Sequence, residues 1–364
     1  MPESEYEETV FLPTIPGLGA LYTQGVAGSV RGKLGLTPPG AAVELPRVVY
    51  QASGVQTDDL AEQLREYQEL VHEPLSDLMP SGYLHVLAFP LAMAVMVRPD
   101  FPLPLLGMVH LANDASLYRP VELGDVLEVK AWAENLRPHP KGTQVDLVGE
   151  VWVDQPDGAD PVLAWHGVST YLAKGVSLPT SEEVSTVGAH APGSTTDVVG
   201  ANAPGSTTDV DAGAPSVVLR EVAESRFDGT SNPTNDWTPP FPTGRWNLSS
   251  GLGREYAAIS GDRNPIHLSA LTAKAFGFPR AIAHGMYTAA RALAETGPGR
   301  GDTYRWTVDF AKPVLLPSKV DVAITPMHDD AVVPRATSNS AGYAYQGWNS
   351  KKQIKHFSGT VTPI

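Results

Sequence analysis

The chain of 364 residues contains no cysteine. This absence excludes disulfide bonds, thiolate metal ligands and a cysteine nucleophile, and it is typical of a cytoplasmic protein. Basic residues are also few, because 26 Lys and Arg stand against 40 Asp and Glu and leave a net charge of −14. Such a surface repels nucleic acid and anionic membranes, so we expect neither as a partner.

Long hydrophobic runs are absent as well. The longest, Val86–Val97, is too short to span a bilayer and contains Pro90. No basic segment followed by an apolar core opens the chain, no Gly-rich phosphate loop follows a strand, and no His-Glu-x-x-His pair is present. We therefore expect a soluble protein that uses no nucleotide cofactor and no metal.

The stretch Tyr256–His267, which reads YAAISGDRNPIH, contains the residues best suited to chemistry. It places Asp262 and His267 on either side of an Asn-Pro step, which favours a helix start with Asn as the cap. Gly261 allows a sharp turn, so both side chains can point into one small volume. A carboxylate beside a histidine is suited to proton transfer near neutral pH.

Spacing alone leaves a structural alternative open. Asp262 would then only cap a helix, and His267 would lie on the surface of that helix without a catalytic role.

The stretch and its continuation, AFGFPRAIAHGMYTAARAL from Ala275 to Leu293, resemble the hydratase 2 motif of MaoC-like dehydratases and (R)-specific enoyl-thioester hydratases. The resemblance implies a hot dog fold, in which a curled antiparallel sheet wraps around one long helix. It also implies that Asp262 and His267 are a catalytic dyad.

The same resemblance places an oxyanion hole at the backbone N–H of Gly285, where the central helix begins. Free N–H groups at a helix start stabilise negative charge on a thioester oxygen. Asn264, His284 and Met286 are the neighbouring positions at which we expect substrate contacts, and His284 mainly orients the turn.

An internal repeat indicates a second copy of the fold, since Tyr118–Val129 aligns without a gap on Ala311–Val322. An apolar helical run lies upstream of each copy, at Tyr83–Val97 and at Met286–Ala294. The prediction is an α+β double hot dog. The predicted boundaries are an N-terminal arm at 1–45, a degenerate hot dog at 46–175, a low-complexity linker at 176–240 and a catalytic hot dog at 241–364.

The first copy lacks the chemistry. The corresponding stretch, Leu64–Tyr83, contains no Gly-Asp-x-Asn-Pro-x-His, and its His72 and Glu73 are adjacent. Two-domain members of the family resemble this arrangement, which implies that the first half binds the acyl chain in a widened groove that admits a long chain.

Alternating apolar residues between turn signals predict the strands. They fall at Val126–Trp132, Thr143–Trp152, Ala164–Leu172, Arg245–Leu248, Thr303–Phe310, Val320–Thr325, Gly342–Trp348 and Gln353–Val361.

The expected function is the (R)-specific hydration of trans-2-enoyl thioesters, or the reverse dehydration, without a cofactor. Coenzyme A and acyl carrier protein are both anionic, so either needs a local basic patch, for which Arg119, Lys174, Arg280 and Lys312 are candidates. A hot dog thioesterase and a non-catalytic acyl-thioester-binding subunit remain alternatives. Pairing of sheet edges makes a homodimer plausible.

Overall fold

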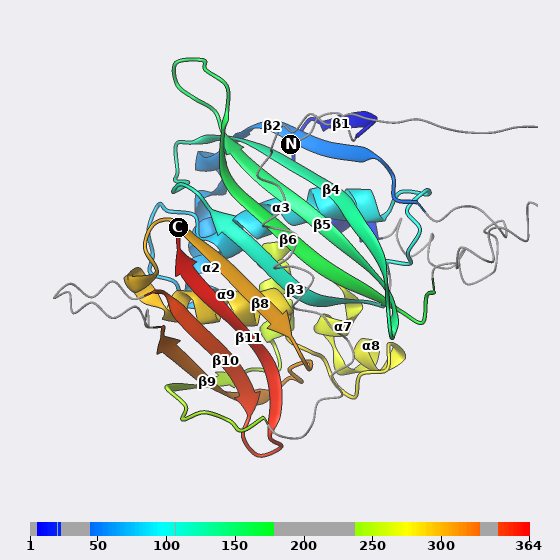
Figure 1. Cartoon of the computed structure of the whole chain (residues 1–364), viewed down its shortest axis with the longest axis vertical. Coiled ribbons are helices and arrows are strands. Elements are labelled where there is room, and N and C mark those ends of the chain that lie inside the picture. The colour runs from blue at the N-terminus through cyan, green and yellow to red at the C-terminus, as the bar shows by residue number, and fades with distance from the viewer. Residues whose placement is uncertain (1–5, 20, 23–43, 106, 178–236, 328–340) are drawn as a thin grey trace, which may run out of the picture. The chain divides into compact units, whose positions relative to one another are not determined.

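The computed structural model describes residues 6–19, 21–22, 44–105, 107–177, 237–327 and 341–364. Their strands form one sheet in the order β1-β2-β4-β5-β6-β3-β8-β11-β10-β9-β7, with α2, α3 and α9 behind it in Figure 1. These elements belong to one compact unit. The predicted linker, with both copies of APGSTTDV, lies almost entirely outside the described residues.

The first half of the fold runs from β1 to β6. Its elements are β1 (Glu8–Leu12), β2 (Val48–Gln56), η1 (Thr57–Leu60), α2 (Ala61–Val71), α3 (Ser81–Met96), β3 (Met108–Leu117), β4 (Val126–His139), β5 (Gly142–Val153) and β6 (Val162–Lys174).

The second half runs from β7 to the end of the chain. Its elements are β7 (Gly244–Leu248), α6 (Leu252–Ser260), α7 (Pro265–Leu268), α8 (Ala270–Ala275), α9 (Gly285–Glu295), η2 (Gly297–Arg300), β8 (Tyr304–Phe310), β9 (Ser318–Pro326), β10 (Tyr343–Asn349) and β11 (Ile354–Pro363). The predicted strands of both halves therefore form.

Both halves arrange their strands in the same way. The order is β2-β4-β5-β6-β3 in the first half and β7-β9-β10-β11-β8 in the second. Along the chain, a buried central helix precedes β3 in the first half and β8 in the second, namely α3 and α9. The repeated segments, Tyr118–Val129 and Ala311–Val322, lead into β4 and β9, which are equivalent strands. The topology thus agrees with the internal repeat.

The two predicted sheets join into one. β3 pairs antiparallel with β8, with Ala115 opposite Trp306, so the edge strand of each half finds its partner in the other half. Arg305 on β8 forms an ion pair with Asp114 on β3 across this seam. Pairing in this way satisfies backbone groups that an isolated edge would leave open.

The central helix of the first half, α3, is apolar all round and buried along nearly its whole length. It continues through Pro90, although proline removes one backbone hydrogen bond. Small residues bring this helix close to the sheet, because a Cβ on Gly149 would lie 2.8 Å from the Cβ of Ala88. Burial of both faces explains why the sequence shows no polar stripe here.

The N-terminal arm packs on the first half. β1 pairs parallel with β2, with Leu12 opposite Ala52, and the side chains of Leu18 and Leu21 are buried in the core. The sequence prediction of an arm included neither this strand nor these contacts. Among the described residues, no helix is long and apolar enough to cross a membrane.

Candidate active site

The turn between α6 and α7 positions the predicted dyad. α6 ends at Gly261, which adopts a left-handed conformation with φ of 72°. Only glycine fits here easily, since φ is positive and a Cβ would lie 2.9 Å from the side chain of Leu18. The chain turns at this point and directs Asp262 toward the interior.

Asn264 shapes the rest of this turn. Its side-chain oxygen accepts a hydrogen bond from the N–H of Ile266 at 3.3 Å, and Pro265 follows as the first residue of α7. The N–H of Asn264 itself donates to Asp262 Oδ1 at 3.2 Å. Asn264 is therefore a helix cap, and the capped turn brings Asp262 and His267 to the same side.

His267 is buried, with 8% of its surface exposed. Its Nδ1 lies 2.9 Å from the carbonyl oxygen of Ile282, and because a carbonyl only accepts, Nδ1 carries the proton. Nε2 then keeps a lone pair. Burial, reinforced by the neighbouring His284, lowers the pKa of His267 to about 3, so the ring is neutral at physiological pH and its Nε2 can accept a hydrogen bond.

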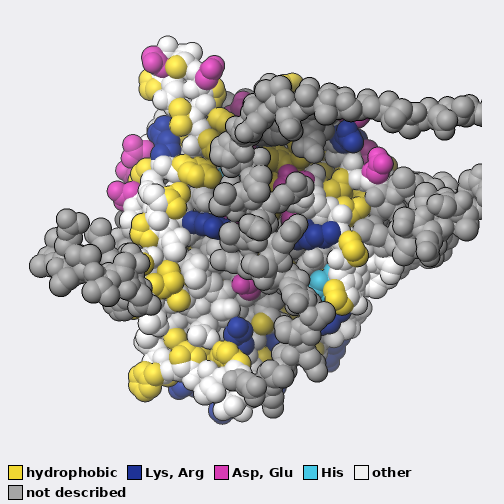
Figure 2. Space-filling model, viewed as in Figure 1, with side chains coloured by type: hydrophobic (Ala, Val, Ile, Leu, Met, Phe, Trp, Pro, Cys, Tyr) yellow, Lys and Arg dark blue, Asp and Glu magenta, His cyan; other side chains and the backbone are white. Residues whose placement is uncertain are grey.

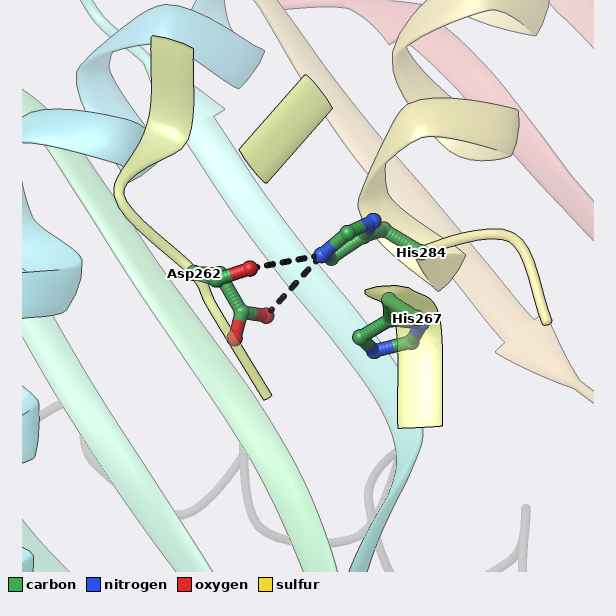
Figure 3. A group of neighbouring side chains, drawn as sticks. All are labelled: Asp262, His267 and His284. Carbon is green, nitrogen blue, oxygen red and sulfur yellow. Dashed lines mark hydrogen bonds and ion pairs between the residues drawn. The ribbon is translucent and has the colours of Figure 1, made fainter. Parts of the chain in front are cut away.

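His284 lies between the dyad and the start of α9. Its Nε2 is 3.0 Å from the carbonyl oxygen of Asp262 and 3.6 Å from Asp262 Oδ2, so this nitrogen donates. The rings of His284 and His267 stack with centroids 3.7 Å apart. Figure 3 shows the arrangement, with His284 facing Asp262 and His267 beside it. Sequence reasoning gave His284 an orienting role, and this geometry fits that role.

The carboxylate of Asp262 is the most accessible member of the group, with 21% of its side chain exposed. Burial raises its pKa, but His284, His267, the hydroxyl of Tyr22 and the N–H of Asn264 together lower it below the ordinary value. Asp262 is therefore ionised at neutral pH. An ionised acceptor and a neutral base at one turn can hold and deprotonate a water molecule.

Asp262, His267 and His284 also need testing as metal ligands, since one ligand atom from each lies within 4.8 Å of the others. A ligating nitrogen must be unprotonated. Nε2 of His284 instead donates a hydrogen bond to the carbonyl oxygen of Asp262, so this nitrogen carries its proton and has no lone pair for a metal. The donor set thus fits proton transfer better than metal binding.

The start of α9 supplies the predicted oxyanion position. Gly285 is the first residue of this helix, whose first N–H groups have no acceptor within it. A Cβ on Gly285 would lie 2.9 Å from the ring of Phe310, so glycine is required for packing as well. Met286 is 6% exposed and belongs to the hydrophobic core, so in this structure its side chain packs inward.

Sequence reasoning missed several residues near Asp262. Tyr22, from the N-terminal arm, donates a hydrogen bond to Asp262 Oδ1. The ring of Tyr256 packs against that of His284 in a tilted arrangement, with centroids 4.9 Å apart, and entered the motif only as an aromatic residue. The rings of His110 and Tyr171 in the first half stack with centroids 4.4 Å apart. Burial lowers the pKa of His110 and raises that of Tyr171, and the charge of Asp262 acts on both groups as well. No local pattern links these positions to the motif.

Comparisons with known proteins place the chain in a family. A family model described as MaoC like domain matches residues 247–339. The 3-hydroxyacyl-thioester dehydratase X of Mycobacterium tuberculosis is 32% identical over 298 residues, and the alignment covers 78% of this chain and 88% of that protein. The chain belongs to the MaoC-like dehydratase family.

A solved structure of this relative and a further curated protein extend the comparison. The crystal structure of HtdX of Mycobacterium tuberculosis matches with a TM-score of 0.61 and 28% identity, over 87% of this MaoC-like chain and 100% of that one. The (R)-specific enoyl-CoA hydratase of Aeromonas caviae is 33% identical over 89 residues, which are 23% of this chain and 66% of that protein. The predicted family, hot dog fold and hydratase or dehydratase class are thus confirmed.

Proposed function

We propose that this MaoC-like dehydratase adds water to trans-2-enoyl thioesters and removes it from (3R)-hydroxyacyl thioesters. Three relatives support the substrate class by their names, which are 3-hydroxyacyl-thioester dehydratase X, 3-hydroxybutyryl-CoA dehydratase and (R)-specific enoyl-CoA hydratase. The observation that carries the proposal is the convergence of an ionised carboxylate and a neutral imidazole beside the first N–H groups of a helix.

The protonation states suggest a division of roles in hydration. Asp262 accepts one hydrogen bond from the water, and Nε2 of His267 takes a proton as the water oxygen bonds to Cβ. His267 then returns this proton to Cα, so one water is consumed and no other group is needed. The dehydration runs through the same steps in reverse.

The charge that develops on the thioester oxygen needs a donor. We assign this role to the N–H of Gly285, because the start of α9 offers a free backbone donor and the field of the helix behind it. His284, the residue before Gly285, holds Asp262 in place through the hydrogen bond from its Nε2 to the Asp262 carbonyl oxygen. We propose that it is a positioning residue rather than a substrate contact. Asn264 is likewise a positioning residue, because its side-chain oxygen caps α7 by accepting a hydrogen bond from the N–H of Ile266.

The first half of the fold contains a small cavity beside its central helix. This cavity of about 10 Å³ lies between α3 and the strands β5 and β6, with His85, Phe89 and Tyr171 in its wall. That volume holds roughly one water, so an acyl chain of any length that entered here would displace side chains. The acyl-binding role of the first half, the homodimer and the cytoplasmic location stay predictions.

The test is to mix the purified protein with crotonyl-CoA and follow the loss of the conjugated enoyl absorbance. The proposal predicts a (3R)-hydroxy product, and Asp262→Asn should abolish the reaction while the far-UV circular dichroism is kept. Release of free thiol without hydration would identify a thioesterase instead. If no thioester of any chain length is turned over, the protein is a binding subunit.

A further inference from the structure

A second hollow lies at the end of the second half where β10 turns into β11. Its volume is about 740 Å³, within the range of small-molecule sites. Most of its wall comes from three segments, namely residues 278–280 before α9, residues 312–319 around the start of β9, and the turn at residues 349–354, and Arg245, Asp321 and His356 complete it. None of these residues belongs to the dyad, to Gly285 or to Tyr22.

The wall of this hollow is strongly basic in an acidic chain. It contains one carboxylate, Asp321, which forms an ion pair with Arg245. No ion pair within the described part of the chain involves its other cations, Arg280, Lys312, Lys319, Lys351 and Lys352. In Figure 2 the acidic side chains lie mainly in the upper part of the visible face, and Lys and Arg side chains occur in its lower part. An anion would be attracted here although the net charge is −14.

A buried histidine adds an independent sign of a ligand. His356 lines the hollow and is 6% exposed, and its Nδ1 donates to the carbonyl oxygen of Lys312 at 3.0 Å. Its Nε2 has no hydrogen-bond partner among the residues that the structure describes. Burial lowers the pKa of His356, so the ring is neutral and Nε2 accepts a hydrogen bond. A ligand that matches this wall carries an N–H or O–H donor as well as negative charge.

The rest of the wall is apolar. Phe278, Leu315 and Ile354 stand between the cations, together with three prolines. A flat aromatic base packs well on such side chains, whereas inorganic phosphate alone would leave them uncovered. The set of an apolar wall, separate cations and one hydrogen-bond acceptor matches a phosphorylated adenosine.

The hollow lies close enough to the dyad for one substrate to reach both. Arg280 precedes His284 by four residues, which an extended chain covers in at most about 14 Å. Backbone hydrogen bonds from Leu316 to Ala281 and from Ala283 to Val314 hold this segment against the wall. A pantetheine arm is longer than that span, so a thioester at the dyad can place its nucleotide in the hollow.

We propose that this hollow binds the 3′-phosphorylated ADP end of coenzyme A. The inference rests on the proposed hydration of enoyl thioesters and names the carrier of that substrate. Lys319, Lys351 and Lys352 hold the phosphates, Phe278 packs on the adenine, and Nε2 of His356 accepts a hydrogen bond from the adenine amino group or the ribose. Of the four cations that sequence analysis named, Arg280 and Lys312 line the hollow.

The experiment compares crotonyl-CoA with crotonyl-pantetheine, which has the same reacting group and no nucleotide. In the double variant Lys351→Glu/Lys352→Glu, the ratio of kcat/KM for the CoA thioester to that for the pantetheine thioester should fall about tenfold. Lys141→Glu makes the same kind of charge change at an exposed lysine outside the hollow and should leave the ratio unchanged. Adenosine 3′,5′-bisphosphate should compete with the CoA thioester in the wild type only.

Each outcome decides one question. An unchanged ratio in the double variant overturns the proposal. An unchanged ratio with a raised KM for a carrier-protein thioester also overturns it, and makes the hollow a protein docking surface. Failure of the wild type to hydrate crotonyl-CoA and crotonyl-pantetheine alike would count against the proposed function itself, whereas hydration of the CoA thioester alone would show that the nucleotide is needed.

Discussion

The two halves of the fold build the same turn and use it differently. α2 ends at His72 in a left-handed conformation with φ of 61°, and a carboxylate, Glu73, follows. α6 ends at Gly261 with φ of 72°, and the carboxylate of Asp262 follows. Glu73 forms a buried ion pair with Arg300 from the other half, whereas Asp262 faces two neutral histidines.

The starts of the central helices differ in the same way. At α3 the N–H of Ser81 donates to the hydroxyl of Tyr304 at 3.3 Å, and Trp165 donates to the Ser81 hydroxyl at 2.7 Å. At α9 the N–H of Gly285 has no hydrogen-bond acceptor among the described residues. The start of α3 is therefore occupied by side chains from other elements and has a structural role. The start of α9 keeps a free N–H that a substrate can reach.

The largest expected effect comes from His267→Ala. Loss of the base should lower kcat for crotonyl-CoA by about 10²–10⁴-fold, since general base catalysis contributes that much. The matched control is His72→Asn, which keeps a residue that tolerates the left-handed conformation in the first half. Steady-state kinetics on both variants tests the comparison, and it would fail if His72→Asn were as slow as His267→Ala.

The next effect concerns stability. Arg300→Met leaves the carboxylate of Glu73 buried without its partner, with 9% of that side chain exposed in the wild type. The free energy of unfolding should fall by about 3–5 kcal/mol. Urea denaturation measures it, and Arg65→Met, which breaks exposed pairs with Glu62 and Glu69, should show no measurable change. Equal losses in the two variants would mean that burial of the Glu73 pair has no special role.

Stability should also fall as the pH drops below 6.5. The pKa of His267 is about 3 in the fold against an ordinary 6.5, so the unfolded chain binds the proton first. This contribution is complete above pH 6.5 and is lost at about 1.4 kcal/mol per pH unit as the pH falls toward 3. Urea denaturation at pH 7, 6 and 5 gives the slope of the free energy of unfolding against pH. In His267→Asn this slope should be smaller by the contribution of about one bound proton. An identical slope would show that His267 is not held neutral.

The smallest expected effect comes from the N-terminal arm. Tyr22→Phe removes the hydrogen bond to Asp262 Oδ1, and kcat should fall about three- to tenfold because a charge-assisted bond helps to hold the carboxylate. Tyr6→Phe, which changes another tyrosine of the arm, is the control. Unchanged kinetics in Tyr22→Phe would show that the arm contributes only packing through Leu18.

The sequence predicted those parts of the molecule that local patterns specify. Gly261, Asn264 and Pro265 determine the turn of the site through backbone conformation and capping, and the alternating strands followed from side-chain period. β2 and β3 were not predicted. β2 contains Gly54 with φ of 72° and an irregular register between Ala52 and Val55, which interrupts its alternation.

Contacts between distant segments could not be predicted. Tyr22 and Asp262 are 240 positions apart, and Glu73 and Arg300 are 227 apart. Neither pair leaves a periodic trace in the sequence. The pairing of β3 with β8 could not be predicted either, because the sequence of a strand indicates that it pairs with another strand but not with which one.

The most direct test of the account compares the two equivalent carboxylates in one experiment. Asp262→Asn and Glu73→Gln are measured for both kcat with crotonyl-CoA and free energy of unfolding. We predict that Asp262→Asn loses at least about a hundredfold in kcat with its stability kept. Glu73→Gln should lose about 2 kcal/mol or more of stability with kcat kept. Normal turnover in Asp262→Asn, or a large loss of kcat in folded Glu73→Gln, would contradict the account.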